Sequence, residues 1–227
     1  MSDIGVILLD SDLYRPVGDV GNPDTFAFPV RYHRATGAYA PHVVERGASG
    51  LLDIFVAAGR TLVGQGARAL STSCGFLSIY QRQIADATGA TVATSALLQA
   101  PLLLRMLPSD ARLGVVTANA ASLSDAHLEA AGVTAGERPR IELIGLEETA
   151  HFYPTVVLGQ GRLDPTRAAP EVVAAATEAV ARDPGIRAFL LECANLPPYA
   201  ASIRSATGLP VWDISTMLTW VHQGLSG

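Results

Sequence analysis

An internal repeat restricts the possible folds of this sequence more than any other feature. The segment that begins at Gly66 aligns without a gap on the segment that begins at Gly185, at a constant offset of 119 residues. The alignment brings the only two cysteines, Cys74 and Cys193, into register. Two copies are too few for a solenoid, so the repeat predicts two similar lobes that face each other.

Short apolar runs alternate with helical patterns, which is typical of parallel α/β architecture. The runs that predict buried strands are Ile4–Leu9, Ala67–Thr72, Thr91–Thr94, Arg112–Thr117, Ile141–Ile144, Arg187–Leu191 and Val211–Asp213, with Pro29–His33 as a weaker edge strand. The predicted helices are Ala48–Val63, Leu77–Thr88, Ala96–Leu107, Leu123–Ala131, Glu171–Arg182, Pro198–Thr207 and Ser215–His222. Ser11–Asp24 and Glu147–Pro165 are rich in Gly, Pro and Asp, so we expect them to be functional loops.

These elements predict an α/β fold with two pseudo-symmetric lobes. Each lobe is expected to be a parallel sheet flanked by helices, with the active site in the cleft between the lobes. We expect residues 1–98 and 213–227 to form the lobe that carries Cys74, and residues 99–212 to form the lobe that carries Cys193.

The chain contains no lysine, so all 16 basic residues are arginines. This excludes a Schiff-base lysine and hence ordinary pyridoxal phosphate catalysis, and it excludes a P-loop. The net charge of −5 argues against a nucleic-acid partner. The histidines share no ligand spacing and neither cysteine has a Cys-x-x-Cys partner, so we expect neither a metal nor a cofactor.

The apolar stretch Ile4–Leu9 is not preceded by basic residues, so we do not expect a signal peptide. No apolar run approaches the ~20 residues that span a bilayer, so we expect no membrane partner. The sequence therefore predicts a cytoplasmic protein whose cysteines are free thiols.

Each cysteine follows a predicted strand and precedes a predicted helix. That position favours a thiolate, because the helix start presents free N–H groups to it. Two thiols facing each other across a cleft could remove a proton from one face of a carbon next to a carboxylate and return a proton to the other face. The enolate that forms would need nearby donors; the candidates are Thr72, Ser73, the Gly75 N–H, the Ala194 N–H and Asn195.

The first predicted loop contains Arg15 and Asn22. Loops of this kind often carry specificity, so either side chain could contact the substrate carboxylate. With no lysine present, an arginine or a helix start must supply the positive charge.

The sequence resembles the cofactor-independent aspartate/glutamate/hydantoin racemase superfamily over essentially its whole length. The resemblance is carried by Ile4-Gly5-Val6 through Asp10-Ser11, by Thr72-Ser73-Cys74, by Leu113-Gly114-Val115 with Thr117 and Asn119, and by Glu192-Cys193-Ala194-Asn195. It implies that Cys74 and Cys193 are the two acid/base residues and that Asp10 and Ser11 line the site. Family members are often dimers, so a homodimer is one expectation.

We therefore expect a racemase or epimerase of the aspartate/glutamate type, acting on a small carboxylate-bearing substrate. Glutamate racemases follow their cysteines with Asn-Thr and Thr-His, whereas this chain has Gly75-Phe76 and Ala194-Asn195, which leaves the substrate open. One alternative is an enzyme similar to the maleate isomerases, which keep two cysteines, or to the arylmalonate decarboxylases, which keep one. Another is a two-lobed small-molecule binding protein without catalysis.

Overall fold

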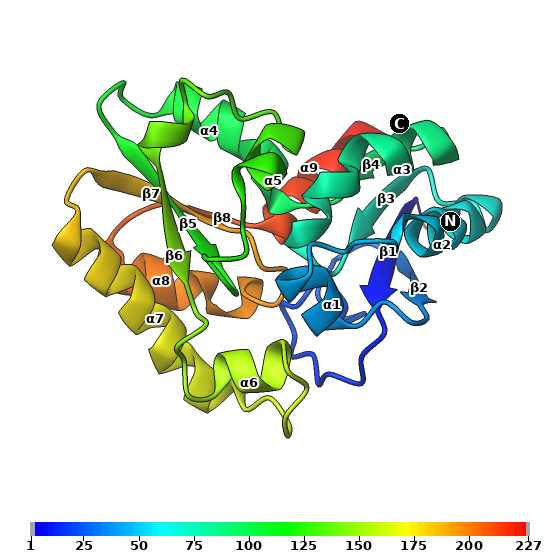
Figure 1. The fold of residues 1–227 in the computed structure, drawn as a ribbon, viewed down its shortest axis with the longest axis horizontal. Helices are drawn as coiled ribbons and strands as arrows, with labels where there is room; N and C mark the ends of the chain where they lie inside the picture. Colours follow the sequence, from blue (N-terminus) through cyan, green and yellow to red (C-terminus); the bar gives the residue numbers. More distant parts are fainter. Residues whose placement is uncertain (1–2, 226–227) are drawn as a thin grey trace.

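The computed structural model describes residues 3–225, and it contains two four-stranded sheets in which every strand pairing is parallel (Figure 1). The first sheet has the order β2-β1-β3-β4 and the second repeats it as β6-β5-β7-β8. The strands are β1 (Ile4–Leu9), β2 (Val30–Ala35), β3 (Ala69–Thr72), β4 (Thr91–Ala93), β5 (Arg112–Thr117), β6 (Ile141–Gly145), β7 (Ile186–Leu191) and β8 (Val211–Trp212). The predicted two-lobed α/β fold is confirmed.

Helices cover the sheets and connect every pair of successive strands except β1 and β2, which a long loop joins. The α-helices are α1 (Ala40–Glu45), α2 (Leu52–Gly64), α3 (Gln81–Thr88), α4 (Ala100–Met106), α5 (Asp125–Ala130), α6 (Phe152–Val156), α7 (Pro165–Arg182), α8 (Ala200–Thr207) and α9 (Ile214–Leu225). Short 3₁₀ helices are η1 (Gly75–Tyr80), η2 (Ala96–Gln99), η3 (Arg138–Arg140) and η4 (Pro197–Tyr199).

The sequence repeat corresponds to a structural repeat. Helices α3 and α8 begin and end at residues related by the same offset of 119 as the two cysteines. Each ends at a glycine in the left-handed conformation, with φ of 66° at Gly89 and 69° at Gly208. The two halves are therefore copies of one β-turn-helix unit, and Phe76 of the first half is equivalent to Asn195 of the second.

Three local expectations differ most from the structure. The helix predicted from Glu171 begins at Pro165, with the Asp164 side chain as its N-cap, and Pro170 lies inside it. Glu171 does not stabilise the start of its own helix, because its carboxylate accepts hydrogen bonds from the backbone N–H groups of His151 and Phe152.

The two other errors concern short helices. The second predicted loop, Glu147–Pro165, contains α6, and no helix was expected at α1. Both helices are too short to show a clear 3.6-residue period in the sequence.

Polar contacts join the lobes, and two of them involve the short 3₁₀ helices η1 and η2. The Ser78 hydroxyl of η1 donates to the backbone oxygen of His127 in α5 at 3.1 Å. The Gln99 amide of η2 donates to the backbone oxygen of Asp213 at 2.9 Å.

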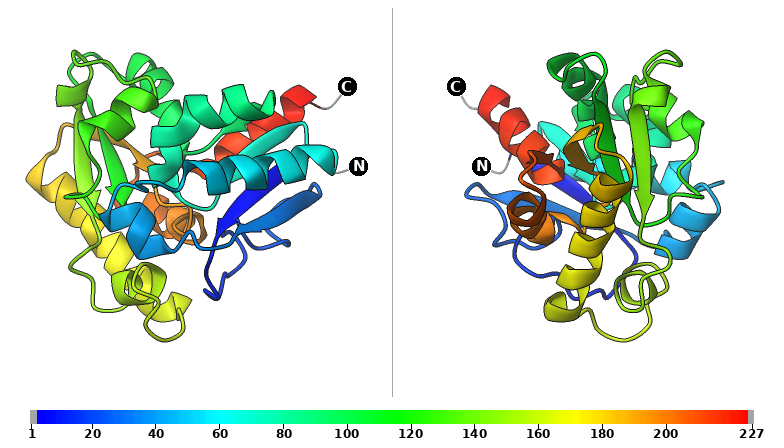
Figure 2. Two further views of the ribbon diagram at one scale, coloured as in Figure 1. Left: turned by 45° about the vertical axis from the view of Figure 1, so that its right-hand side comes forward. Right: turned by 90° about the vertical axis from the view of Figure 1, so that its left-hand side faces the viewer.

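The last helix, α9, starts after the second sheet and extends to the first lobe (Figure 2). There the Arg68 guanidinium donates to the backbone oxygen of Leu225 at 2.7 Å. Residues 1, 2, 226 and 227 of the expected first lobe lie outside the described residues. The lobe boundaries stay a prediction. Within residues 3–225, no helix is both long and apolar enough to cross a membrane.

Candidate active site

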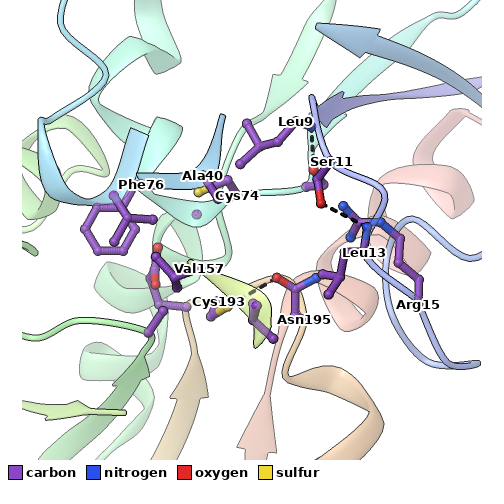
Figure 3. A pocket seen from close by; sticks show the side chains of 16 residues that line it. Leu9, Ser11, Leu13, Arg15, Ala40, Cys74, Phe76, Val157, Cys193 and Asn195 are labelled. Carbon is purple, nitrogen blue, oxygen red and sulfur yellow. Dashed lines mark hydrogen bonds between the residues drawn. The ribbon is translucent and has the colours of Figure 1, made fainter. Parts of the chain in front are cut away.

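Cys74 and Cys193 stand at equivalent places, just beyond the carboxyl ends of β3 and β7. The carboxyl ends of parallel strands lie at one edge of a sheet, and here those edges of the two sheets border the same pocket. Both cysteines are free thiols, each with 8% of its surface exposed, and both line the pocket (Figure 3). The fold thus brings together the two residues that the repeat singled out.

The pocket is small and mostly apolar. It contains about 430 Å³ of space free of protein atoms, part of which is open solvent. Both lobes contribute to its apolar wall, which consists of Leu9, Leu13, Ala40, Val44, Phe76, Ala118, Val156 and Val157.

The environment holds both cysteines as neutral thiols. Burial raises the pKa of the Cys74 and Cys193 thiols well above the ordinary value, and the nearby Glu192 carboxyl raises both further. The backbone of Phe76 acts in the opposite direction on Cys74, and that of Asn195 does so on Cys193, because each donates a hydrogen bond that lowers the thiol pKa. Deprotonation of either thiol therefore needs a partner that accepts the proton.

Cys193 is the end of a polar chain that crosses between the lobes. Its Sγ donates to Asn195 Oδ1 at 3.7 Å, and Asn195 Nδ2 donates to Asp19 Oδ2 at 2.6 Å. Asp19 is fully buried and accepts from Arg15 Nη1 at 2.9 Å. Because Asp19 accepts from the Asn195 Nδ2, the Asn195 Oδ1 faces Cys193. A hydrogen-bond acceptor beside the sulfur favours the neutral thiol over the thiolate.

Among the described residues 3–225, Glu192 is the only carboxylate that lines the pocket. It is fully buried, and its Oε2 accepts from the Thr117 hydroxyl at 2.7 Å, whereas its Oε1 has no hydrogen-bond partner. The carboxyl lies against Gly75, because a side-chain carbon built there would overlap Oε1 and approach Cδ to 2.8 Å. Burial raises the pKa of Glu192 to about 7, and the Thr117 hydrogen bond partly opposes this.

Other predicted site residues border the pocket or support it. Ser11 and Ser73 line it, although their hydroxyls accept from the backbone N–H groups of Leu13 and Leu9, both at 3.0 Å. Thr72 lies beneath it, where its hydroxyl donates to the Thr94 backbone oxygen at 2.7 Å and holds the cysteine turn against β4.

Besides Thr72 and Thr117, four predicted site residues do not line the pocket. Asp10 Oδ2 accepts from the Gly37 N–H, and this side chain borders the neighbouring groove. Asn22 holds the first loop by donating to the Arg15 backbone oxygen, and the Asn119 amide donates to the Tyr153 hydroxyl. Ala194 is buried behind the turn.

The sequence analysis did not identify Asp19 or the apolar wall from α1 and α6 as parts of the site. Tyr153 of α6 was also missed; its hydroxyl donates to Glu45 Oε1 of α1 at 2.9 Å, so the two helices are joined across the lobes beside the pocket. No motif marks any of these positions. Among residues 3–225, no cluster of three or more His, Cys, Asp or Glu side chains could hold a metal ion.

No protein-family model matches the chain. Among curated proteins, it is 32% identical over 218 residues to a dimethylsulfoniopropionate lyase of Durusdinium sp. clade D, covering 93% of this chain and 71% of that protein. It is also 33% identical over 225 residues to dimethylsulfoniopropionate lyase 3 of Emiliania huxleyi, covering 94% of this chain. The chain spans only 57% of the length of that second protein.

Solved structures share the fold at low sequence identity. An arylmalonate decarboxylase variant has a TM-score of 0.56 at 21% identity, with 92% of this chain and 86% of the other covered. Glutamate racemase from Francisella tularensis, in complex with D-glutamate, has a TM-score of 0.54 at 18% identity, with 97% and 80% covered. These structures share the two-lobed fold that the resemblance to the racemase superfamily implied.

Proposed function

Because this chain belongs to the dimethylsulfoniopropionate lyase family, we propose that it is a lyase that removes a proton next to a carboxylate and expels a neutral leaving group from the adjacent carbon. The observation that carries this proposal is the pair of buried thiols in one small pocket, in a chain with 32% identity to such a lyase. The racemase expected from the sequence is the second candidate.

The chemistry of a sulfonium-bearing propionate fits the pocket. When the sulfonium is on the carbon next to the α-carbon, loss of the α-proton allows the carbon–sulfur bond to break, and dimethyl sulfide and acrylate form. The leaving group departs neutral and needs no acid, so one base is sufficient. The apolar wall suits the two methyl groups, and Arg15, which lines the pocket, is the candidate partner for the carboxylate.

We assign different roles to the two cysteines. Cys193 donates to Asn195 Oδ1 and is therefore favoured as a thiol, suited to donate a hydrogen bond to the substrate carboxylate as negative charge develops. Among residues 3–225, no side chain accepts a hydrogen bond from the Cys74 thiol, so we assign Cys74 as the base that takes the α-proton.

The test is release of dimethyl sulfide from dimethylsulfoniopropionate by the purified protein, followed by gas chromatography, with acrylate measured by NMR. Cys74→Ser should lower kcat by about 1,000-fold, because a serine hydroxyl is a much poorer base. Cys193→Ser keeps a donor and should be affected less. If only Cys193→Ser abolishes release, the two roles are reversed; if the parent protein releases no dimethyl sulfide, the lyase proposal is wrong.

Racemisation is favoured by one specific observation, the equivalence of the two cysteines within the repeat. Each sulfur receives a backbone hydrogen bond from the residue two positions later, which is the symmetry that two-base inversion would use. In deuterated water, a racemase would place deuterium on the α-carbon of an aspartate- or glutamate-type acid with inversion. A lyase would leave these acids unchanged.

A further inference from the structure

Glu192 is a buried carboxyl group that the proposed elimination does not yet use. It precedes Cys193 in the chain, and its Oε1 lies against Gly75, the residue after Cys74. It therefore adjoins both cysteine turns, and it raises the thiol pKa of both. Its Oε1 is buried, has no hydrogen-bond partner and belongs to a residue that lines the pocket.

The pocket offers few alternatives for taking a proton from a thiol. Its other titratable lining residues are Arg15, Cys74 and Cys193, and an arginine does not act as a base. The nearest further carboxylate in the polar chain, Asp19, already accepts from Asn195, Arg15 and the Gly21 N–H.

The two halves of the repeat differ at the position of Glu192. The residue equivalent to Glu192 in the first half is Ser73, whose hydroxyl accepts from the Leu9 N–H. A carboxylate is thus present at only one of the two equivalent positions, which suits a reaction with one base rather than inversion with two.

We propose that the Glu192 carboxylate is the proton acceptor that converts the Cys74 thiol into the reactive thiolate, a role that rests on the proposed lyase function. Glu192 Oε1 takes the proton from Cys74 Sγ. The thiolate then takes the α-proton of the substrate, the C–H electron pair forms the carbon–carbon double bond, and dimethyl sulfide leaves with the electron pair of the carbon–sulfur bond. Glu192 finally releases its proton to water, which accounts for the one proton that the overall elimination produces.

The surroundings of Glu192 suit this exchange at neutral pH. Thr117 of β5 donates to Oε2, and the titratable neighbours are the two thiols, with Arg15 acting on Cys74 from the first loop. Gly75 on the η1 side brings no charge. Glu192 must be ionised to accept a proton, so kcat should rise with pH through about 7.

Glu192→Gln separates this role from a structural one. Glutamine keeps the size and can still bond to Thr117, but it accepts no proton, so kcat should fall by about 100-fold and the rise through neutral pH should disappear. Removing the carboxylate also removes its repulsion, so the thiols should ionise at a lower pH, as measured by thiolate absorbance. Slower turnover together with easier thiol ionisation is the expected signature. If kcat is unchanged or increases, water is the proton acceptor and the proposal is wrong.

Two more variants complete the design. Thr117→Val removes the hydrogen bond to Oε2, so the midpoint of the kcat profile should move up by about one pH unit; an unmoved midpoint contradicts the assignment.

Asp213→Asn is the matched control, because Asp213 is another buried carboxyl with a raised pKa but does not line the pocket. It should leave the profile unchanged. The thiol titrations need no substrate, so a failed lyase assay leaves them interpretable: an unshifted titration in Glu192→Gln shows that Glu192 is not coupled to the thiols.

Discussion

At the scale of single residues, the site depends on buried polar groups. Asp19, Glu192 and Asn195 are all nearly or fully buried, and each affects a cysteine directly or through one hydrogen bond. Single substitutions in the site should therefore destabilise the folded protein, because burying a polar group that has lost its hydrogen-bond partner costs free energy.

Glu192 should make the protein less stable as the pH rises. Its pKa is raised from 4.5 to about 7 in the folded state, so the folded protein keeps a proton that the unfolded chain loses. The stability conferred by this group is complete below about pH 4.5 and is lost as the pH rises through about 7, a change of about 3 kcal/mol. Urea unfolding across this range should show that the free energy of unfolding falls for the parent relative to Glu192→Gln. If the free energy of unfolding changed with pH in the same way for the parent and for Glu192→Gln, this prediction would be wrong.

Asp19→Asn should make Cys193 more reactive. Without the carboxylate, the Asn195 amide is free to turn its N–H group toward the sulfur, and a donor there lowers the thiol pKa. Alkylation of Cys193 by iodoacetamide, followed by mass spectrometry against pH, should begin at a lower pH. Asp12→Asn is the control, since Asp12 is exposed and pairs with Arg34; equal shifts in both variants would show that net charge is the cause.

Only part of the site could be predicted from single residues. The two cysteines were found because the repeat places them in register. Asp19 could not be found, because it is 176 positions away from Asn195 in the sequence and no pattern joins them. The roles of Asn22 and Asn119 in holding loops depend on backbone geometry that sequence spacing does not describe.

At the scale of helices and strands, the equivalent glycines that end α3 and α8, Gly89 and Gly208, should contribute equally to the stability of the protein. Both have φ near +70°, where a side chain is strained, and a Cβ on either would meet no atom within 4 Å. Gly89→Ala and Gly208→Ala should therefore each cost about 1 kcal/mol through backbone strain alone. Gly64→Ala, within α2 and without positive φ, is the control and should not destabilise the protein in thermal unfolding. A large difference between the two glycine variants would contradict the equivalence of the two helices.

The strands were predicted better than the helices. β1 and β5 have the predicted bounds, because uniformly apolar runs bounded by polar residues are typical of buried parallel strands. The start of α7 was missed because Pro170 looks like a helix start, whereas Asp164 is the residue that caps the helix. Five- and six-residue helices such as α6 and α1 are stabilised by tertiary contacts and leave little periodic signal.

At the scale of the whole molecule, the lobes meet around the pocket, and the Tyr153–Glu45 hydrogen bond joins them beside it. Tyr153→Phe should weaken this contact and raise KM by about fivefold, with a smaller effect on kcat, because a hydrogen bond of about 1 kcal/mol that holds the lobes together beside the pocket is lost. Thr177→Val is the control, since that hydroxyl bonds only within its own helix. An unchanged KM in Tyr153→Phe would show that the contact does not contribute to binding.

The equivalence of Phe76 and Asn195 has a stereochemical consequence. The repeat places an aromatic ring beside one cysteine and an amide beside the other, so the two sides of the pocket differ although the backbones that form them match. A methylene group held between them presents its two hydrogens, pro-R and pro-S, to different surroundings. An enzyme of this construction should remove only one of the two, and a substrate deuterated at a single prochiral position would lose or retain its label completely according to its configuration.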